Sequence, residues 1–182
     1  GSEMCIRDRG NLTLTNINGL CRIALDKLKK TYEQDIQEKN IRIVFDNLTL
    51  SLMMEVNVEQ FSKVLAGILK NSMYALLKKS ETVTFSPEIF LGLKVNKDML
   101  EIMIRDNGSG IDENIKDKIF APFFTTKTTG EAAGVGLYLC REIVQNHRGT
   151  IEVESKKGEY TQFLITIPVY QPKTITPPKE EE

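Results

Sequence analysis

Asp106 stands where a carboxylate could do chemistry. It follows Ile102 and Ile104 at intervals of two residues, so in a strand it continues the apolar side that faces the core. A carboxylate in that place is costly unless a hydrogen-bond donor faces it. Asp-Asn-Gly is also a common turn sequence, and on this triplet alone a turn is the simpler interpretation.

The residues after Asp106 indicate a phosphate-binding backbone. Residues 106–111 (DNGSGI), 120–127 (FAPFFTTK) and 134–137 (GVGL) fall close together in the chain. Residues 134–137 open a predicted helix, so free amides and the positive helix end could approach phosphates there. The motif lacks the third glycine of a dinucleotide fingerprint, and the chain has no Walker-type Gly-Lys-Ser/Thr, so a flexible connection is the alternative reading of this motif alone.

Asn71 is the third residue of interest. It lies among apolar and small residues in a helix predicted from about Asn57 to Lys79. A neutral side-chain oxygen there could coordinate Mg²⁺, which takes oxygen ligands while it bridges phosphates. A lone helical asparagine is more often exposed or already hydrogen-bonded, so Asn71 indicates a metal site only in combination with the other motifs.

The elements that must position these residues follow from the hydrophobic periodicity. We predict an amphipathic helix near 16–36, a strand at 41–45, the helix at 57–79, a hairpin of 89–95 with 100–104, a helix near 136–146, and strands at 150–155 and 161–168. This order predicts an α+β fold. Its form is a two-layer α/β sandwich, in which a mixed, mostly antiparallel sheet carries about three helices on one face.

Composition bounds the function classes. The chain has 182 residues, which fits one domain, and its 24 basic against 25 acidic residues give no global attraction to nucleic acid. No apolar run approaches the roughly 18 residues of a membrane span, so we expect a soluble fragment without direct membrane contact. One histidine excludes a His-rich metal site, and three scattered cysteines fit neither a disulfide framework nor zinc. These counts favour a reducing, cytoplasmic compartment.

Both ends of the chain differ from its middle. Three prolines and a closing Lys-Glu-Glu-Glu predict a disordered tail at 171–182. Residues 1–9, which begin Gly-Ser and end MCIRDR, are interpreted as a cloning or gene-model remnant. The folded domain is therefore expected at 10–170, in a natural protein that continues upstream.

In order and spacing, these pieces resemble the ATP-binding catalytic domain of sensor histidine kinases. That family belongs to the GHKL superfamily, with type II topoisomerases and mismatch-repair ATPases, and the resemblance implies a Bergerat-type ATP-binding fold. Asn71 falls in the N box, residues 106–110 in the G1 box, 120–127 in the F box and 134–137 in the G2 box. Four boxes in order are far more specific than any one of them.

The resemblance implies a site for ATP and Mg²⁺. Asp106 would accept the adenine amino group, directly and through a water that Thr161 helps to hold, while Asn71 would ligate Mg²⁺ and Lys127 would face the phosphates. Residues 123–133 would form a mobile lid, with Phe123 and Phe124 both anchoring it and meeting the phosphoacceptor helices. The implied nucleotide-binding residues are Asn71, Ala75, Asp106, Gly108, Gly110, Ile111, Lys127, Gly134, Val135, Gly136, Leu137 and Thr161.

The same resemblance implies a protein-histidine kinase. It would transfer the ATP γ-phosphoryl group to a histidine on a separate two-helix dimerisation domain, which passes phosphate to a response regulator. His147 lies at a helix-to-strand junction and is not expected to be the acceptor. Whether the full-length protein is anchored in the inner membrane stays open.

Three alternatives remain at this point: a GHKL-type ATPase, an anti-sigma-type serine kinase and a degenerate, nucleotide-free interaction module. GHKL ATPases are known for a glutamate four residues before the metal-binding asparagine, and this chain has Gly67 there. Intact Asp106, Asn71 and Lys127 argue against the nucleotide-free module. Ala132 and Tyr74 depart from the family's usual glycine and basic residue, which puts nucleotide affinity in question.

Overall fold

One five-stranded sheet organises the part of the chain that the structure, a computed structural model, describes: residues 11–122 and 136–169. The elements in chain order are β1 (Thr13–Asn16), α2 (Ile17–Thr31), α3 (Glu33–Glu38), β2 (Arg42–Asp46), β3 (Met53–Val56), α4 (Val58–Ser80), β4 (Glu88–Asn96), β5 (Met99–Asp106), α5 (Glu113–Lys116), α6 (Leu137–Asn146), β6 (Thr150–Lys156) and β7 (Tyr160–Pro168). None of the helices within these ranges combines the length and the apolar character that a membrane crossing requires.

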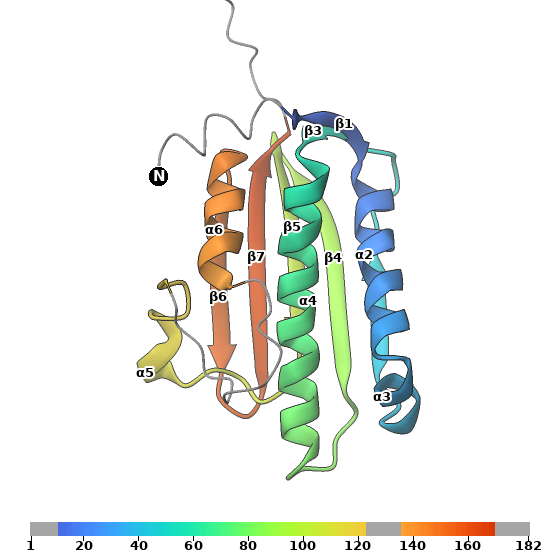
Figure 1. Cartoon of the computed structure of the whole chain (residues 1–182), viewed down its shortest axis with the longest axis vertical. Helices are drawn as coiled ribbons and strands as arrows, with labels where there is room; N and C mark the ends of the chain where they lie inside the picture. Colours follow the sequence, from blue (N-terminus) through green and yellow to red (C-terminus); the bar gives the residue numbers. More distant parts are fainter. Residues whose placement is uncertain (1–10, 123–135, 170–182) are drawn as a thin grey trace, which may run out of the picture.

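The sheet has the strand order β2-β4-β5-β7-β6. β2 runs parallel to β4, and the other three neighbouring pairs are antiparallel. α6, α4 and α2 lie side by side across one face of it, with α4 in the middle (Figure 1). The predicted two-layer α+β architecture, with its mixed and mostly antiparallel sheet, is therefore confirmed.

The core lies between α4 and the inner face of the sheet. Alternate residues of β5 are buried and the residues between them are more exposed, as expected for a strand with one face on the core. The fully buried side chains Leu65, Ile68 and Leu69 of α4 belong to the same cluster as those of β4 and β5. Asp106 ends the buried row of β5, which places a carboxylate where the apolar face stops.

The long helix α4 begins and ends as predicted. Asn57 is its N-cap, and its side chain accepts a hydrogen bond from the Gln60 amide at 3.1 Å. The hairpin of β4 and β5 and the closing strands β6 and β7 also match the predicted alternation, to within two residues at each end.

The predicted helix at 16–36 was wrong in its extent. α2 ends at Thr31, and Tyr32 leaves helical geometry with φ −110° and ψ 26° before α3 begins. The short strands β1 and β3, which pair antiparallel, and the single turn of α5 were not predicted. Each has four residues, too few for a periodic pattern to emerge.

His147 joins the start of α4 to the end of α6. Its Nε2 accepts the Asn57 amide proton at 3.0 Å, and its Nδ1 donates to the Ile143 carbonyl at 2.8 Å. The carbonyl can only accept, so the ring is neutral with its proton on Nδ1. The side chain is 3% exposed and packs edge-on against Phe61. A histidine held in this way is not accessible as a phosphoryl acceptor.

We expect His147→Phe to lower the free energy of unfolding by roughly 1–3 kcal/mol. Phenylalanine keeps an aromatic ring beside Phe61 but leaves the Asn57 amide without its acceptor. Urea denaturation followed by circular dichroism measures this, with Gln145→Ala on the exposed side of α6 as the control. An unchanged denaturation midpoint in His147→Phe would contradict the structural role assigned to the ring.

Candidate functional site

Three polar side chains interrupt the apolar inner face of the sheet at one end. Asp106 on β5 is directly opposite Thr161 on β7, and Thr161 is directly opposite Ser155 on β6. Directly opposed residues point to the same face of a sheet, so the three form a row, called here the polar row. They are 2%, 5% and 9% exposed. Asp106 and Thr161 were predicted site residues, whereas Ser155 was not.

The carboxylate of Asp106 is only partly compensated. Its Oδ1 accepts the Gly108 amide proton at 2.9 Å. Burial raises the pKa of Asp106 to about 7, against the lowering effects of that amide, the Ser72 hydroxyl and the charges of Lys79 and Arg105. Since burial prevails, the ionised form would gain from a further donor, which is what a ligand amino group supplies.

Ser72 is a buried hydroxyl beside this carboxylate. It is 1% exposed, and it is near enough to lower the pKa of Asp106. Its Oγ nevertheless meets the geometry of a hydrogen bond with no atom of residues 11–122 and 136–169. A buried polar atom without a partner is rare and costly, so it points to a ligand or a water at this place. The sequence signal for Ser72 was its place among the apolar residues along one side of the helix predicted at 57–79.

Gly108 lets the loop after β5 lie directly on α4. A Cβ on Gly108 would be 2.6 Å from the Ala75 carbonyl carbon and 2.7 Å from the Ala75 Cβ. The Ser109 amide donates to the Ala75 carbonyl at 3.1 Å. The structure therefore brings together the two predicted residues Ala75 and Gly108, and both must be small for the contact to exist.

Gly110 and Ile111 hold the same loop against the turn between β6 and β7. Gly110 has φ +67°, and a Cβ there would overlap the Lys156 backbone carbonyl. The Ile111 amide donates to Ser155 Oγ at 2.8 Å, and the Gly158 amide donates to the Ser109 carbonyl at 2.6 Å. Both predicted residues thus act through the backbone in these contacts, and Ile111 reaches the polar row.

Asn107 and Lys79 fix the position of Asp106 from the other side. Asn107 belongs to the predicted G1 box, but neither residue was among the predicted binding residues. Asn107 Oδ1 accepts the Glu88 amide proton and its Nδ2 donates to the Ser86 carbonyl, both at 2.8 Å. Lys79 Nζ donates to the Asn107 carbonyl at 2.9 Å. The side chain after Asp106 therefore ties β5 to the segment that enters β4.

Asn71 is half-buried on α4, one helical turn before Ala75 and so on the same side of the helix. Gly67 lies one turn earlier again. In the described ranges no group of three or more His, Cys, Asp or Glu side chains could hold a metal ion. The Asn71 amide oxygen is a neutral oxygen of the kind that Mg²⁺ takes as a ligand.

The remaining predicted residues belong to the opening of α6 and the segment before it. Gly136 is the N-cap of α6 and Leu137 is its first residue. A Cβ on Gly136 would meet nothing within 4 Å, so this backbone is open. Lys127, Gly134 and Val135 lie outside the described residues, as do the predicted lid at 123–133 and the tail at 171–182.

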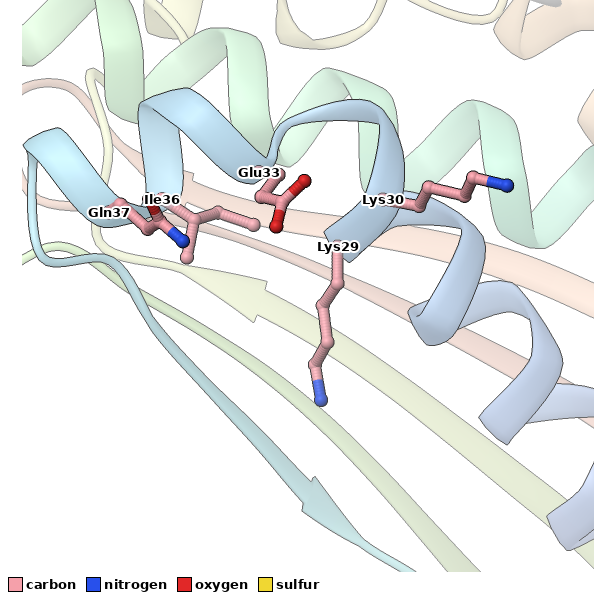
Figure 2. A pocket seen from close by; sticks show the side chains of 5 residues that line it. All are labelled: Lys29, Lys30, Glu33, Ile36 and Gln37. Carbon is pink, nitrogen blue, oxygen red and sulfur yellow. The ribbon is translucent and has the colours of Figure 1, made fainter.

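A surface hollow elsewhere is not part of this site. Figure 2 shows the side chains that line it at the junction of α2 and α3, and it shares no residue with the polar row. The lining residues are Lys29, Lys30, Glu33, Ile36 and Gln37. None of them was predicted to bind a ligand.

The site thus combines a buried carboxyl group at the end of a two-layer α/β sheet with a glycine loop beside it. Residues 57–171 match the family model described as "Histidine kinase-, DNA gyrase B-, and HSP90-like ATPase". The chain belongs to this family.

Known proteins agree with this assignment. The sensor histidine kinase AtsR of Burkholderia thailandensis is 33% identical over 77% of this chain and 24% of its own length. The catalytic domain of histidine kinase ThkA superposes with a TM-score of 0.70 at 28% identity, over 86% of this chain and 95% of that one. ThkA in complex with the response regulator protein TrrA gives 0.65 at 26%, over 87% of this chain and 42% of that one. The chain spans less than a third of the length of the curated relatives it matches.

We expect Asp106→Asn to make the nucleotide-free protein more stable at pH 8 while leaving it little changed near pH 4. A carboxyl whose folded pKa is raised contributes stability that is lost as pH rises toward that pKa, here about 7. The wild type should therefore lose up to about 4 kcal/mol relative to the variant between pH 4 and 7, since one pKa unit corresponds to about 1.4 kcal/mol.

Urea denaturation across this pH range measures the difference, and Asp26→Asn on an exposed part of α2 controls for the lost charge. If the difference in free energy of unfolding between wild type and Asp106→Asn does not grow as the pH rises, hydrogen bonds and charges within the protein fully stabilise the ionised Asp106.

Proposed function

We propose that this chain is the ATP-binding catalytic domain of a two-component sensor histidine kinase. It would pass the γ-phosphoryl group of ATP to a histidine on a separate two-helix dimerisation domain. The observation that carries the proposal is the buried Asp106 carboxyl group, whose pKa burial raises and which lies beside the buried Ser72 hydroxyl. Family membership and the likeness to the ThkA catalytic domain support it.

Adenine would bind at the polar row. An ionised Asp106 accepts the 6-amino group, because that group offers the donor the carboxylate lacks. Ser72 Oγ has both a proton and lone pairs for the ring edge or for a bridging water. The close contact of Gly108 with Ala75 holds the loop on α4, and Gly110 lets the same loop pack against the turn between β6 and β7.

Mg²⁺ and the phosphates would lie toward Asn71 and the start of α6. The amide oxygen of Asn71 fits a hard cation that takes most of its ligands from phosphate and water. When bound, Mg²⁺ neutralises charge on the transferring phosphoryl group. We assign Lys127 and the amides of residues 134–137 to the phosphates as part of this proposal.

The reaction requires this domain to position ATP, and it requires no residue that forms a covalent intermediate. The acceptor would be supplied by the dimerisation domain, since His147 is buried with both ring nitrogens hydrogen-bonded. Gly67, one turn before Asn71, offers no general base for water, which disfavours the ATPase alternative.

The partners follow from the same proposal. The dimerisation domain of its own full-length protein would dock first, and a response regulator would then take the phosphoryl group from it. The solved complex of ThkA with TrrA supports a regulator as partner. We assign the catalytic domain to residues 10–170 and to the cytoplasm, without contact to nucleic acid or membrane.

Isothermal titration with ADP should separate the two roles assigned to Asp106 and Asn71. Asp106→Asn should weaken binding at least tenfold with or without Mg²⁺, because an acceptor of the adenine amino group is replaced by a partly mismatched amide. Asn71→Ala should weaken binding only when Mg²⁺ is present. If Asn71→Ala weakens ADP binding as much in EDTA as with Mg²⁺, Asn71 has no role in metal binding. If Asp106→Asn binds ADP with wild-type affinity, Asp106 is not the adenine site.

The chain alone should not autophosphorylate, but it should label a supplied two-helix domain from its own full-length protein. Radiolabelled ATP and detection of acid-labile phosphate measure both, with Asp106→Asn as the negative control. Phosphate release into water should stay very slow because position 67 carries no base. Robust Asp106-dependent hydrolysis without an acceptor would favour the ATPase, and label on the isolated chain would refute the first expectation.

A further inference from the structure

Ser155 uses every hydrogen-bonding site of its hydroxyl. Its Oγ accepts the Ile111 amide proton at 2.8 Å, donates to the Tyr160 carbonyl at 2.7 Å and lies 3.0 Å from Thr161 Oγ1. A serine hydroxyl has one proton and two lone pairs. The three contacts therefore account for the whole hydroxyl.

This arrangement fixes the proton between Ser155 and Thr161. The Tyr160 carbonyl can only accept, so at 2.7 Å the contact needs the Ser155 proton. If the Ser155 proton turned toward Thr161 instead, Ser155 Oγ and the Tyr160 carbonyl oxygen would face each other at 2.7 Å without a hydrogen between them. The proton in the 3.0 Å contact must then come from Thr161, and Ser155 accepts it.

Because the Thr161 hydroxyl gives its proton to Ser155, its Oγ1 can only accept hydrogen bonds on the side that faces away from Ser155. Thr161 is directly opposite Asp106 in the sheet, on the same face. An ionised carboxylate also accepts only, so two acceptors stand side by side at the end of the row. They cannot bond to each other, and only a donor placed between them satisfies both. That donor is a water molecule or an amino group of the ligand.

We propose that Ser155 is a specificity-determining positioning residue, which turns the Thr161 hydroxyl away from the ligand so that the site accepts a 6-amino purine and rejects a 6-oxo purine. The inference rests on the proposed adenine-nucleotide binding and deepens it. With Ser155 in place, the 6-oxo group of a hypoxanthine base finds no donor from Thr161. Without Ser155, the Thr161 proton is free to turn toward that oxygen or toward Asp106, and both changes reduce the preference for adenine.

A purely structural role for Ser155 predicts something different. Ser155 also holds Ile111 and so supports the glycine loop, whose loosening would weaken every nucleotide alike. The decisive quantity is therefore the ratio of the dissociation constants of IDP and ADP. These two ligands carry the same phosphates and sugar and differ only at the base. Loss of general support leaves this ratio unchanged.

The test is isothermal titration of the whole chain with ADP and IDP. Ser155→Ala should lower the IDP-to-ADP ratio about tenfold, the scale of one neutral hydrogen bond. Asp112→Asn is the matched control, because it weakens the 3.1 Å pair with Lys157 that ties the same loop to the β6–β7 turn. The Asp112 carboxylate accepts hydrogen bonds from Asn114 and Lys157 and not from Thr161, so Asp112→Asn should leave the IDP-to-ADP ratio at the wild-type value.

A double variant tests whether Ser155 acts through the Thr161 hydroxyl. In Thr161→Val there is no proton to orient, so adding Ser155→Ala should change the ratio less than twofold. An equal fall in both affinities for Ser155→Ala, with an unchanged ratio, would overturn the proposal. If Ser155→Ala does not fold, Ser155→Cys should lower the ratio in the same direction but less. If wild type binds no ADP, the proposed function itself has failed.

Discussion

Asp106 places a carboxyl group at the end of an apolar sheet face, where it is 2% exposed and accepts a hydrogen bond from the Gly108 amide. Burial raises its pKa to about 7, so the protein holds the ionised form at a cost that it does not fully offset. The contacts of Asn107, Lys79 and the loop after β5 hold this carboxyl group in place. The site is thereby prepared for a donor that the folded chain does not itself supply.

Two kinds of contact maintain that arrangement. Backbone contacts bring the glycine loop onto α4 through Ala75 and onto the β6–β7 turn through Gly110. Side-chain contacts fix what lies at each end of the site, with Asn107 tied to the entry of β4 and Ser155 tied to Thr161. The small residues permit close approach, and the polar residues determine which hydrogen-bonding edge is presented.

The sequence predicted the parts of this account that depend on period and local chemistry. Asp106 was found because it continues the alternation of β5, and α4 because it has a capped apolar stripe. Ser155 was not predicted, because its contacts with Thr161 and Ile111 depend on strand register. Ser72 lay on the apolar stripe predicted for α4, but its position beside Asp106 depends on how α4 packs on the sheet. The break at Tyr32 was missed because α2 and α3 together continue one amphipathic pattern.

The central claim is that the folded chain gives the ionised Asp106 too few hydrogen-bond donors and that the amino group of adenine supplies a further one. Carbon-13 NMR of the Asp106 side-chain carboxyl, assigned by its loss in Asp106→Asn, measures its pKa directly in the free and ADP-bound protein. The account predicts a pKa near 7 without ligand and a clear fall when ADP binds, because the amino group favours the ionised form. A pKa near 4 in the free protein, or one that ADP leaves unchanged, would contradict it.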